Sequence, residues 1–292
     1  MTVIELSAII ETPEEIGALK KLMDEFKARF GTTVKLRQMG WDNAWTELLS
    51  YSLYGKETDV SHIGSTWCSS LVEMNALRPF KPPEVAQLGG SEAFLKPAWQ
   101  SALVEGDTRV WSIPWTGYTN VFAFRRDLFA KAGLEENICL ESIPNILQTI
   151  QSLKSIGIAY PLLLPTTGNV DLLHAAASWV WEAGGEFIDL TNRKILFTQP
   201  AALAGLRSYF ELFRGLPATA DHFSATQCAN LFANGQAGIS LVNTKSLLGI
   251  LRSGTNPEIM QNFSGTSQDW KEETHLCGEI DSSSLAACII PN

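Results

Sequence analysis

The chain has 292 residues, a length that allows two domains, each with a hydrophobic core of its own. Its formal net charge is −9 and its Lys and Arg residues are scattered, which argues against binding to nucleic acid or to anionic lipid surfaces. No window approaches the run of roughly 18 apolar residues that a membrane-spanning helix needs.

The first 80 residues alternate between strand and helix patterns. Strand patterns cover residues 3–10, 33–39 and 59–64, and helix patterns cover residues 13–30, 43–53 and 65–77. Thr12, Pro13 and Glu15 predict the start of the first helix, as its N-cap, first-turn proline and capping-box partner. Asp42 predicts the N-cap of the second helix. This β-α-β-α-β-α order is typical of a mostly parallel sheet flanked by helices.

An extended aromatic segment follows near the middle of the chain. A helix is expected over residues 91–104, and Gly106 with Asp107 fits a hairpin turn. Residues 110–124 are rich in aromatic side chains and show no helical period. We interpret this segment as a crossing between two lobes.

The second half repeats the alternation of helices and strands. Helix patterns cover residues 144–156, 171–183, 200–213, 225–233 and 244–252, and strand patterns cover residues 159–164 and 237–242. Asp171 and Ser224 fit N-caps, and Gln227 completes a capping box with Ser224. From residue 253 onward the periodicity fades, and the pattern predicts an irregular tail.

Catalytic and metal-binding motifs are missing from the sequence. The five cysteines form no C-x-x-C pair, the four histidines form no i, i+4 pair, and the common nucleophile, phosphate-loop and zinc-protease motifs are absent. We therefore expect a protein that is not an enzyme and that uses no metal and no cofactor. A carbohydrate hydrolase stays open as an alternative, with Glu11, Asp42 and Glu182 as its candidate carboxylates.

The nine tryptophans indicate a carbohydrate ligand. Trp41 and Trp67 follow the second and third predicted strands, at the edge of a parallel sheet where ligands bind. Trp115 and Tyr118 lie on the predicted crossing. An indole ring offers a flat apolar face that matches the C–H face of a pyranose, while nearby polar groups take the hydroxyls.

The ordered set of segments resembles the family 1 extracellular solute-binding proteins of ABC importers, the group that includes maltose-binding proteins. The likeness rests on LMDEFKARF in the first helix, VKLRQMGW, DVSHIGSTW, SIPWTGYTNVFAFRRDLFAKAGL and FANGQAGI, in that order along the chain. The fourth segment is the most specific and is similar to the first hinge crossing of the family. The resemblance covers residues 1–252.

The resemblance implies a two-lobe, type II periplasmic-binding-protein-like α/β fold with a ligand cleft between the lobes. The implied parts are an N-terminal lobe over residues 1–115, a C-terminal lobe over residues 116–252 and an irregular tail over residues 253–292. The implied function is to bind a sugar or oligosaccharide by hinge closure and to present it to the permease subunits of an ABC importer. The protein is expected to act as a monomer.

Nine residues are the candidate ligand contacts, drawn from the loops after the strands, the crossing and the second lobe: Glu11, Trp41, Thr66, Trp67, Trp115, Tyr118, His174, Asn243 and Lys245. The resemblance places contacts near His174, although a hydrogen-bonded core histidine explains this residue nearly as well. Glu11 fits helix-start electrostatics as well as it fits sugar binding.

Two features depart from the family. The resemblance implies a periplasmic or extracellular location, but no signal-peptide pattern precedes the first predicted strand. Family members also continue past FANGQAGI and complete the first lobe, whereas the tail from residue 262 does not match them. We therefore expect a C-terminally truncated or frameshifted product, and a non-functional fragment is the remaining alternative.

Overall fold

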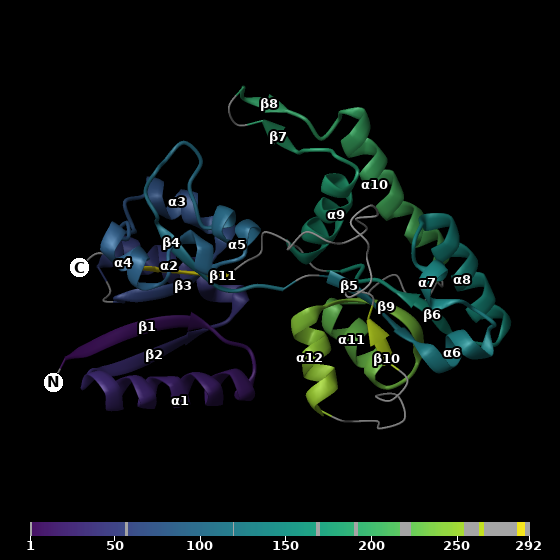
Figure 1. Cartoon of the computed structure of the whole chain (residues 1–292), viewed down its shortest axis with the longest axis horizontal. Helices are drawn as coiled ribbons and strands as arrows, with labels where there is room; N and C mark the ends of the chain where they lie inside the picture. Colours follow the sequence, from purple (N-terminus) through teal and green to yellow (C-terminus); the bar gives the residue numbers. More distant parts are fainter. Residues whose placement is uncertain are drawn as a thin grey trace. The chain divides into compact units, whose positions relative to one another are not determined.

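The chain divides into two compact units, each built on a sheet of its own. The computed structural model describes residues 2–55, 58–118, 120–167, 170–189, 192–216, 223–253, 263–265 and 285–289. The first unit comprises residues 1–117 with 282–292, and the second comprises residues 118–281. Both are α/β structures, as predicted (Figure 1).

The first unit contains a five-stranded sheet in the order β2-β1-β3-β11-β4. Its strands are β1 (Val3–Ile9), β2 (Thr33–Met39), β3 (Val60–Gly64), β4 (Ser112–Thr116) and β11 (Leu285–Ile289). β1 runs parallel to β2 and β3, whereas β11 pairs antiparallel with β3 and β4. The helical segments are α1 (Pro13–Phe30), α2 (Trp41–Tyr54), η1 (Ser65–Trp67), α3 (Cys68–Glu73), α4 (Pro82–Gln87), η2 (Ser91–Ala93) and α5 (Lys96–Ser101).

The start of α1 is confirmed as predicted, and that of α2 is not. The backbone N–H of Glu15 donates to Thr12 Oγ1 at 3.2 Å, and the backbone N–H of Thr12 donates to Glu15 Oε2 at 3.1 Å. Asp42 was predicted as the N-cap of α2, but Gly40 holds that position and Asp42 lies in the first turn. Asn43 Oδ1 accepts the backbone N–H of Gly40 at 2.9 Å. A side chain in the first turn of the helix therefore provides the hydrogen-bond acceptor for the backbone N–H of the N-cap residue.

The single helix predicted over residues 91–104 is also wrong. The segment forms η2 and α5, and Leu95 between them has extended backbone angles (φ −60°, ψ 134°). Pro97 explains the break because it has no N–H to donate and its ring would collide with the preceding helical turn. The helix predicted over residues 65–77 is shorter than expected and ends at Glu73.

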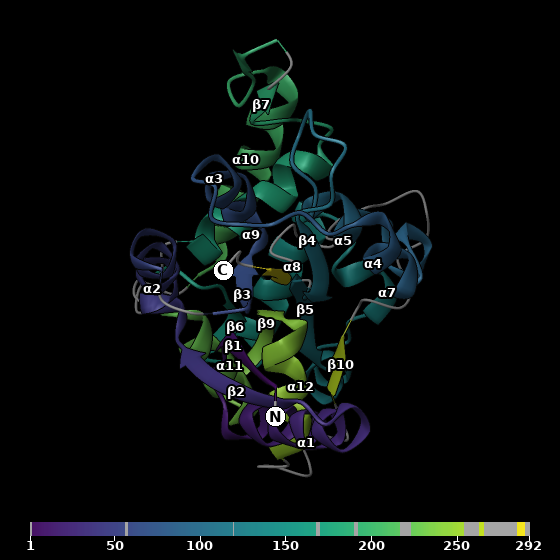
Figure 2. The same cartoon turned by 90° about the vertical axis from the view of Figure 1, so that its left-hand side faces the viewer.

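The core of the first unit joins the sheet to α2 and α3. Its buried apolar side chains include Ile9, Met39, Leu48, Ile63 and Leu71. α1 lies alongside β2 but contains no buried residue (Figures 1 and 2). Three of its apolar residues, Leu22, Phe26 and Phe30, are between 37% and 58% exposed.

The second unit contains a four-stranded sheet in the order β10-β5-β9-β6. Its strands are β5 (Asn120–Arg125), β6 (Tyr160–Leu163), β9 (Ala237–Asn243) and β10 (Phe263–Gly265), and β7 (Ile188–Asp189) with β8 (Lys194–Ile195) forms a separate hairpin. Its helical segments are α6 (Arg126–Lys131), α7 (Glu136–Cys139), α8 (Ile143–Ser155), α9 (Val170–Glu182), α10 (Pro200–Leu212), η3 (Phe213–Gly215), α11 (Ala225–Ala233) and α12 (Thr244–Ser253). β9 runs antiparallel to β5 and parallel to β6.

The sheet of the second unit is buried on both faces. Phe122 and Phe124 of β5 belong to one apolar cluster, and Val121 and Ala123 belong to another. Alternate residues of a strand point to opposite faces, so the two clusters cover the two sides of the sheet. The central strands β5 and β9 are therefore packed from both sides.

Three further expectations fall in the second unit or the tail. The capping box before α11 is confirmed, since the N–H of Gln227 donates to Ser224 Oγ at 3.2 Å and the N–H of Ser224 donates to Gln227 Oε1 at 2.8 Å. Asp171 is not an N-cap, because α9 begins one residue earlier at Val170. Strands β10 and β11 lie in the predicted irregular tail, and the sequence pattern indicates neither. Among the described helices, none combines the length and apolar character that membrane crossing requires.

Candidate functional site

Three tryptophans form a cluster at the carboxyl ends of β2 and β3 in the first unit. Trp41 is the first residue of α2, and its ring lies 5.6 Å from that of Trp67 in an edge-to-face arrangement. The ring of Trp45 also contacts that of Trp67, with the ring centroids 5.4 Å apart. Trp41 is 38% exposed, so the tryptophan cluster presents indole surface at the sheet edge where parallel folds bind ligands.

Gly64 makes room for this cluster at the end of β3. A Cβ at this position would lie 3.3 Å from Cδ2 of Trp67 and 3.6 Å from Cζ3 of Trp41. The first distance is tighter than an ordinary carbon–carbon contact and the second is an ordinary contact, so a side chain here would push against the ring of Trp67. The strand end and the two indoles are therefore packed to contact distance.

Trp115 presents a second indole surface in the first unit. It lies on β4 and is 42% exposed. Its ring packs edge-to-face against the ring of His62, with centroids 4.8 Å apart. The other two candidates of this unit, Glu11 after β1 and Thr66 in η1, are exposed loop or turn residues.

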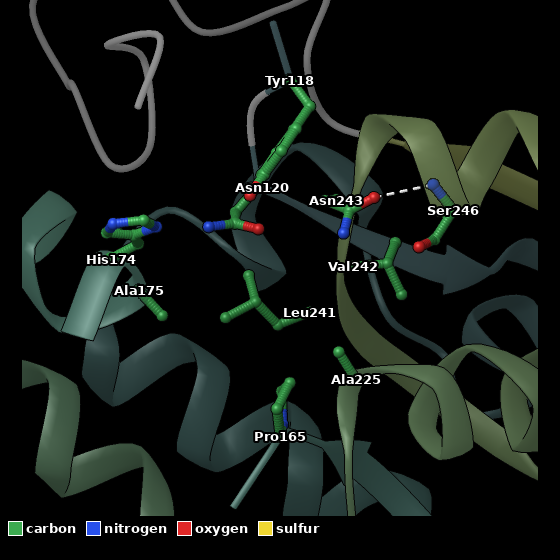
Figure 3. A pocket seen from close by; sticks show the side chains of 10 residues that line it. All are labelled: Tyr118, Asn120, Pro165, His174, Ala175, Ala225, Leu241, Val242, Asn243 and Ser246. Atoms are coloured by element: carbon green, nitrogen blue, oxygen red, sulfur yellow. Dashed lines mark hydrogen bonds between the residues drawn. The ribbon is translucent and has the colours of Figure 1, made fainter. Parts of the chain in front are cut away.

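A pocket lies within the second unit, beside the carboxyl ends of β6 and β9 and the amino end of the antiparallel strand β5 (Figure 3). It encloses about 460 Å³, including its open mouth, and β5, β9 and the helices α9, α11 and α12 contribute to it. Its lining combines five polar residues, Tyr118, Asn120, His174, Asn243 and Ser246, with five apolar residues, Pro165, Ala175, Ala225, Leu241 and Val242.

Asn243 has a fixed orientation in this pocket. It is the last residue of β9 and directly precedes α12, and its Oδ1 accepts the backbone N–H of Ser246 at 2.7 Å (Figure 3). This is the N-cap hydrogen bond of the helix. Because Oδ1 is used in this way, the side chain offers its Nδ2 hydrogens to a ligand as donors.

Among the described residues that line the pocket, none is Asp, Glu, Lys or Arg. Apolar walls with a few placed amides, hydroxyls and an imidazole suit a neutral molecule rich in hydroxyl groups. A buried ion would lack an opposite charge among these lining residues. The chemistry of the pocket is therefore hydrogen bonding combined with apolar contact.

The structure brings together some of the predicted contacts of the second lobe. Tyr118, His174 and Asn243 line one pocket, whereas Lys245 lies half-buried in the first turn of α12 outside the lining. Sequence reasoning missed Asn120 and Ser246. Two signals were available: Asn120 is two residues after Tyr118 in an extended segment, and Ser246 is three residues after Asn243, the spacing of an N-cap.

The described residues do not support the carboxylate alternative. Glu182 is eight residues after His174 on α9, which separates them by about 12 Å along the helix axis. Glu182 thus lies far from the pocket that His174 lines, while Glu11 and Asp42 belong to the first unit. No group of three or more His, Cys, Asp and Glu side chains suited to a metal ion occurs in the part of the chain that the structure describes.

The fold and this pocket define a binding protein of the two-unit α/β type. The chain belongs to the family of bacterial extracellular solute-binding proteins, whose model matches residues 12–270. The match extends past residue 252, where the resemblance in the sequence was expected to end. Members of this family bind solutes and are not enzymes. A search among curated proteins finds no match.

Several solved structures share the fold at low sequence identity. An ABC transporter solute-binding protein from Thermotoga lettingae, bound to α-D-tagatose, is 16% identical with a TM-score of 0.79, and the match covers 99% of this chain and 73% of that one. The GacH receptor of Streptomyces glaucescens, studied with acarbose, is 14% identical with a TM-score of 0.80, covering 100% and 72%. A ribitol complex from Agrobacterium radiobacter K84 is 17% identical with a TM-score of 0.73, covering 99% and 71%.

Proposed function

We propose that the protein binds a neutral sugar or polyol and presents it, as a monomer, to the permease subunits of an ABC importer. The observation that carries the proposal is the pocket of the second unit, whose described lining residues are half polar and carry no charge. Family membership supports solute binding, and the similar proteins bound to tagatose, acarbose and ribitol support this ligand class.

The polar groups of the pocket match the hydroxyls of such a solute. Asn243 donates through Nδ2, and the amide of Asn120 carries both a donor and an acceptor. A sugar hydroxyl both donates and accepts, so it pairs with either type of group. The walls formed by Leu241 and Val242 contact the C–H groups.

The two indole surfaces of the first unit supply a second kind of contact. We propose that Trp41 and Trp67 of the tryptophan cluster, together with Trp115, stack on the C–H face of a sugar ring. Glu11 and Thr66 are the polar candidates beside them, and Lys245 is the weakest candidate because it lies outside the pocket lining.

A thermal-shift screen of the whole chain tests the proposal. The panel contains maltose, D-mannitol, ribitol, tagatose and acarbose, with gluconate and glucuronate as charged controls. A ligand stabilises the state that binds it, so we expect a saturable rise in Tm with a neutral compound and none with the acids. A cooperative melt that shifts only with the acids, or with no compound of the panel, would contradict the proposal.

A further inference from the structure

Buried His62 joins two parts of the first unit. The side chain is 3% exposed and lies on β3, the central strand of the sheet, next to β1. Its Nδ1 accepts the backbone N–H of Ile9 at 3.1 Å, at the end of β1. On its other side, the imidazole ring meets the ring of Trp115 at 4.8 Å with an interplanar angle of 69°.

The hydrogen bond and the ring contact act on the same imidazole. Because Nδ1 is an acceptor, a neutral ring carries its hydrogen on Nε2. The bond to the sheet backbone fixes the plane of the ring, and an edge-to-face contact depends on that plane. Trp115 is 42% exposed, so much of its surface lacks protein neighbours that would fix its rotamer.

We propose that His62 is a positioning residue that holds Trp115 in the orientation in which its indole stacks on the ligand. The proposal rests on the proposed function, since that function assigns Trp115 its stacking role. His62 itself acts through Trp115. The same hydrogen bond ties the end of β1, two residues before Glu11, to this indole.

Two variants separate the two properties of His62. His62→Asn keeps an acceptor near the position of Nδ1 and removes the aromatic ring, whereas His62→Phe keeps a ring and removes the acceptor. Ser61→Ala is the matched control, because it removes a buried hydroxyl pair with Ser7 (2.6 Å) from the same strand. Adjacent strand residues face opposite sides of the sheet, so this control leaves the Trp115 side untouched.

The first readout needs no ligand. The contribution of Trp115 to the near-UV circular dichroism is obtained by subtracting the spectrum of the same protein carrying Trp115→Phe. We expect both His62 variants to weaken this difference spectrum and Ser61→Ala to preserve it. A cooperative thermal melt confirms folding of each variant, and His62→Phe decides the result if His62→Asn does not fold. An unchanged Trp115 spectrum in a folded His62 variant would overturn the proposal.

The second readout is affinity for the panel sugar that gives the largest thermal shift. We expect His62→Asn to weaken binding roughly two- to tenfold, the range of one aromatic pair. The same change in a Trp115→Phe background should have no further effect. Equal losses in both backgrounds would show that His62 acts elsewhere. If no sugar of the panel binds, the proposed function fails, and the ligand-free spectrum still decides the coupling of His62 to Trp115.

Discussion

Replacement of Asn243 by Ala separates folding from binding in the pocket. The substitution removes the N-cap hydrogen bond to the N–H of Ser246 (2.7 Å), and such a loss costs about 1 kcal/mol. For a unit of this size that corresponds to a fall in Tm of about 2–4 °C. It also removes the Nδ2 donor, and one neutral hydrogen bond of about 0.5–1.5 kcal/mol predicts a two- to tenfold weaker Kd.

Asn243→Ser provides the matched comparison. Serine is as good an N-cap as asparagine, so its hydroxyl restores the cap while the pocket still lacks the amide donor. Thermal melts without ligand and calorimetric titration with the best panel sugar measure the two effects. We expect Tm to recover in Asn243→Ser and Kd to stay weakened. Recovery of both quantities in Asn243→Ser, or an unchanged Kd in Asn243→Ala, would refute the reasoning.

Three further predictions concern stability. Gly205→Ala should lower the free energy of unfolding in urea by about 1–3 kcal/mol, because its Cβ would collide with the Trp179 carbonyl. Gly17→Ala, with open space around it, should raise this free energy by up to about 1 kcal/mol. Tyr209→Phe should raise the free energy of unfolding by about 1 kcal/mol at pH 7, since the buried hydroxyl of Tyr209 has no partner among the described residues. Burial raises the pKa of Tyr209 to about 12, so stability should fall above about pH 10 in the wild type and less in this variant. Hydrogen bonds from a guanidinium, a backbone N–H and an indole hold the pKa of Asp107 well below its usual range. Asp107→Asn should therefore lower the free energy of unfolding at pH 7. In an acid titration, the decrease in stability below about pH 4 should be smaller in this variant than in the wild type.

Much of the fold could be predicted from short-range signals. The capping boxes at Thr12 and Ser224 appear as expected, because an N-cap side chain and its partner three residues later interact locally. Asp42 and Asp171 misled the prediction for a related reason. An acidic residue near a helix start fits both the N-cap and the first turn, and the pattern does not distinguish these positions.

The strands of the tail could not be predicted because their pairing is long-range. β11 pairs with β3 and β4, which are more than 150 residues earlier in the chain, and β10 pairs with β5. A three- or five-residue strand leaves a weak periodic signal of its own. Its presence depends on the neighbouring strands that supply backbone hydrogen bonds.

The sequence indicated candidate site residues where a residue type had a plain chemical use, and their roles stay predictions. Tryptophans after strands marked the first unit, and Asn243 after β9 marked the second. Asn120 and Ser246 were missed since asparagine and serine occur at many surface positions. His62 was missed because a histidine within an apolar strand gives no sign that it contacts Trp115, which is 53 residues away.

Isothermal titration calorimetry of the unmodified chain tests the central claim most directly. One neutral polyol, ribitol, is compared with ribonate, which has the same carbon skeleton and a carboxylate at one end, and maltitol is compared with maltobionate in the same way. The uncharged pocket lining predicts saturable binding of at least one neutral compound and much weaker binding of its acid. Tighter binding of the acid in both pairs would contradict a neutral-sugar site.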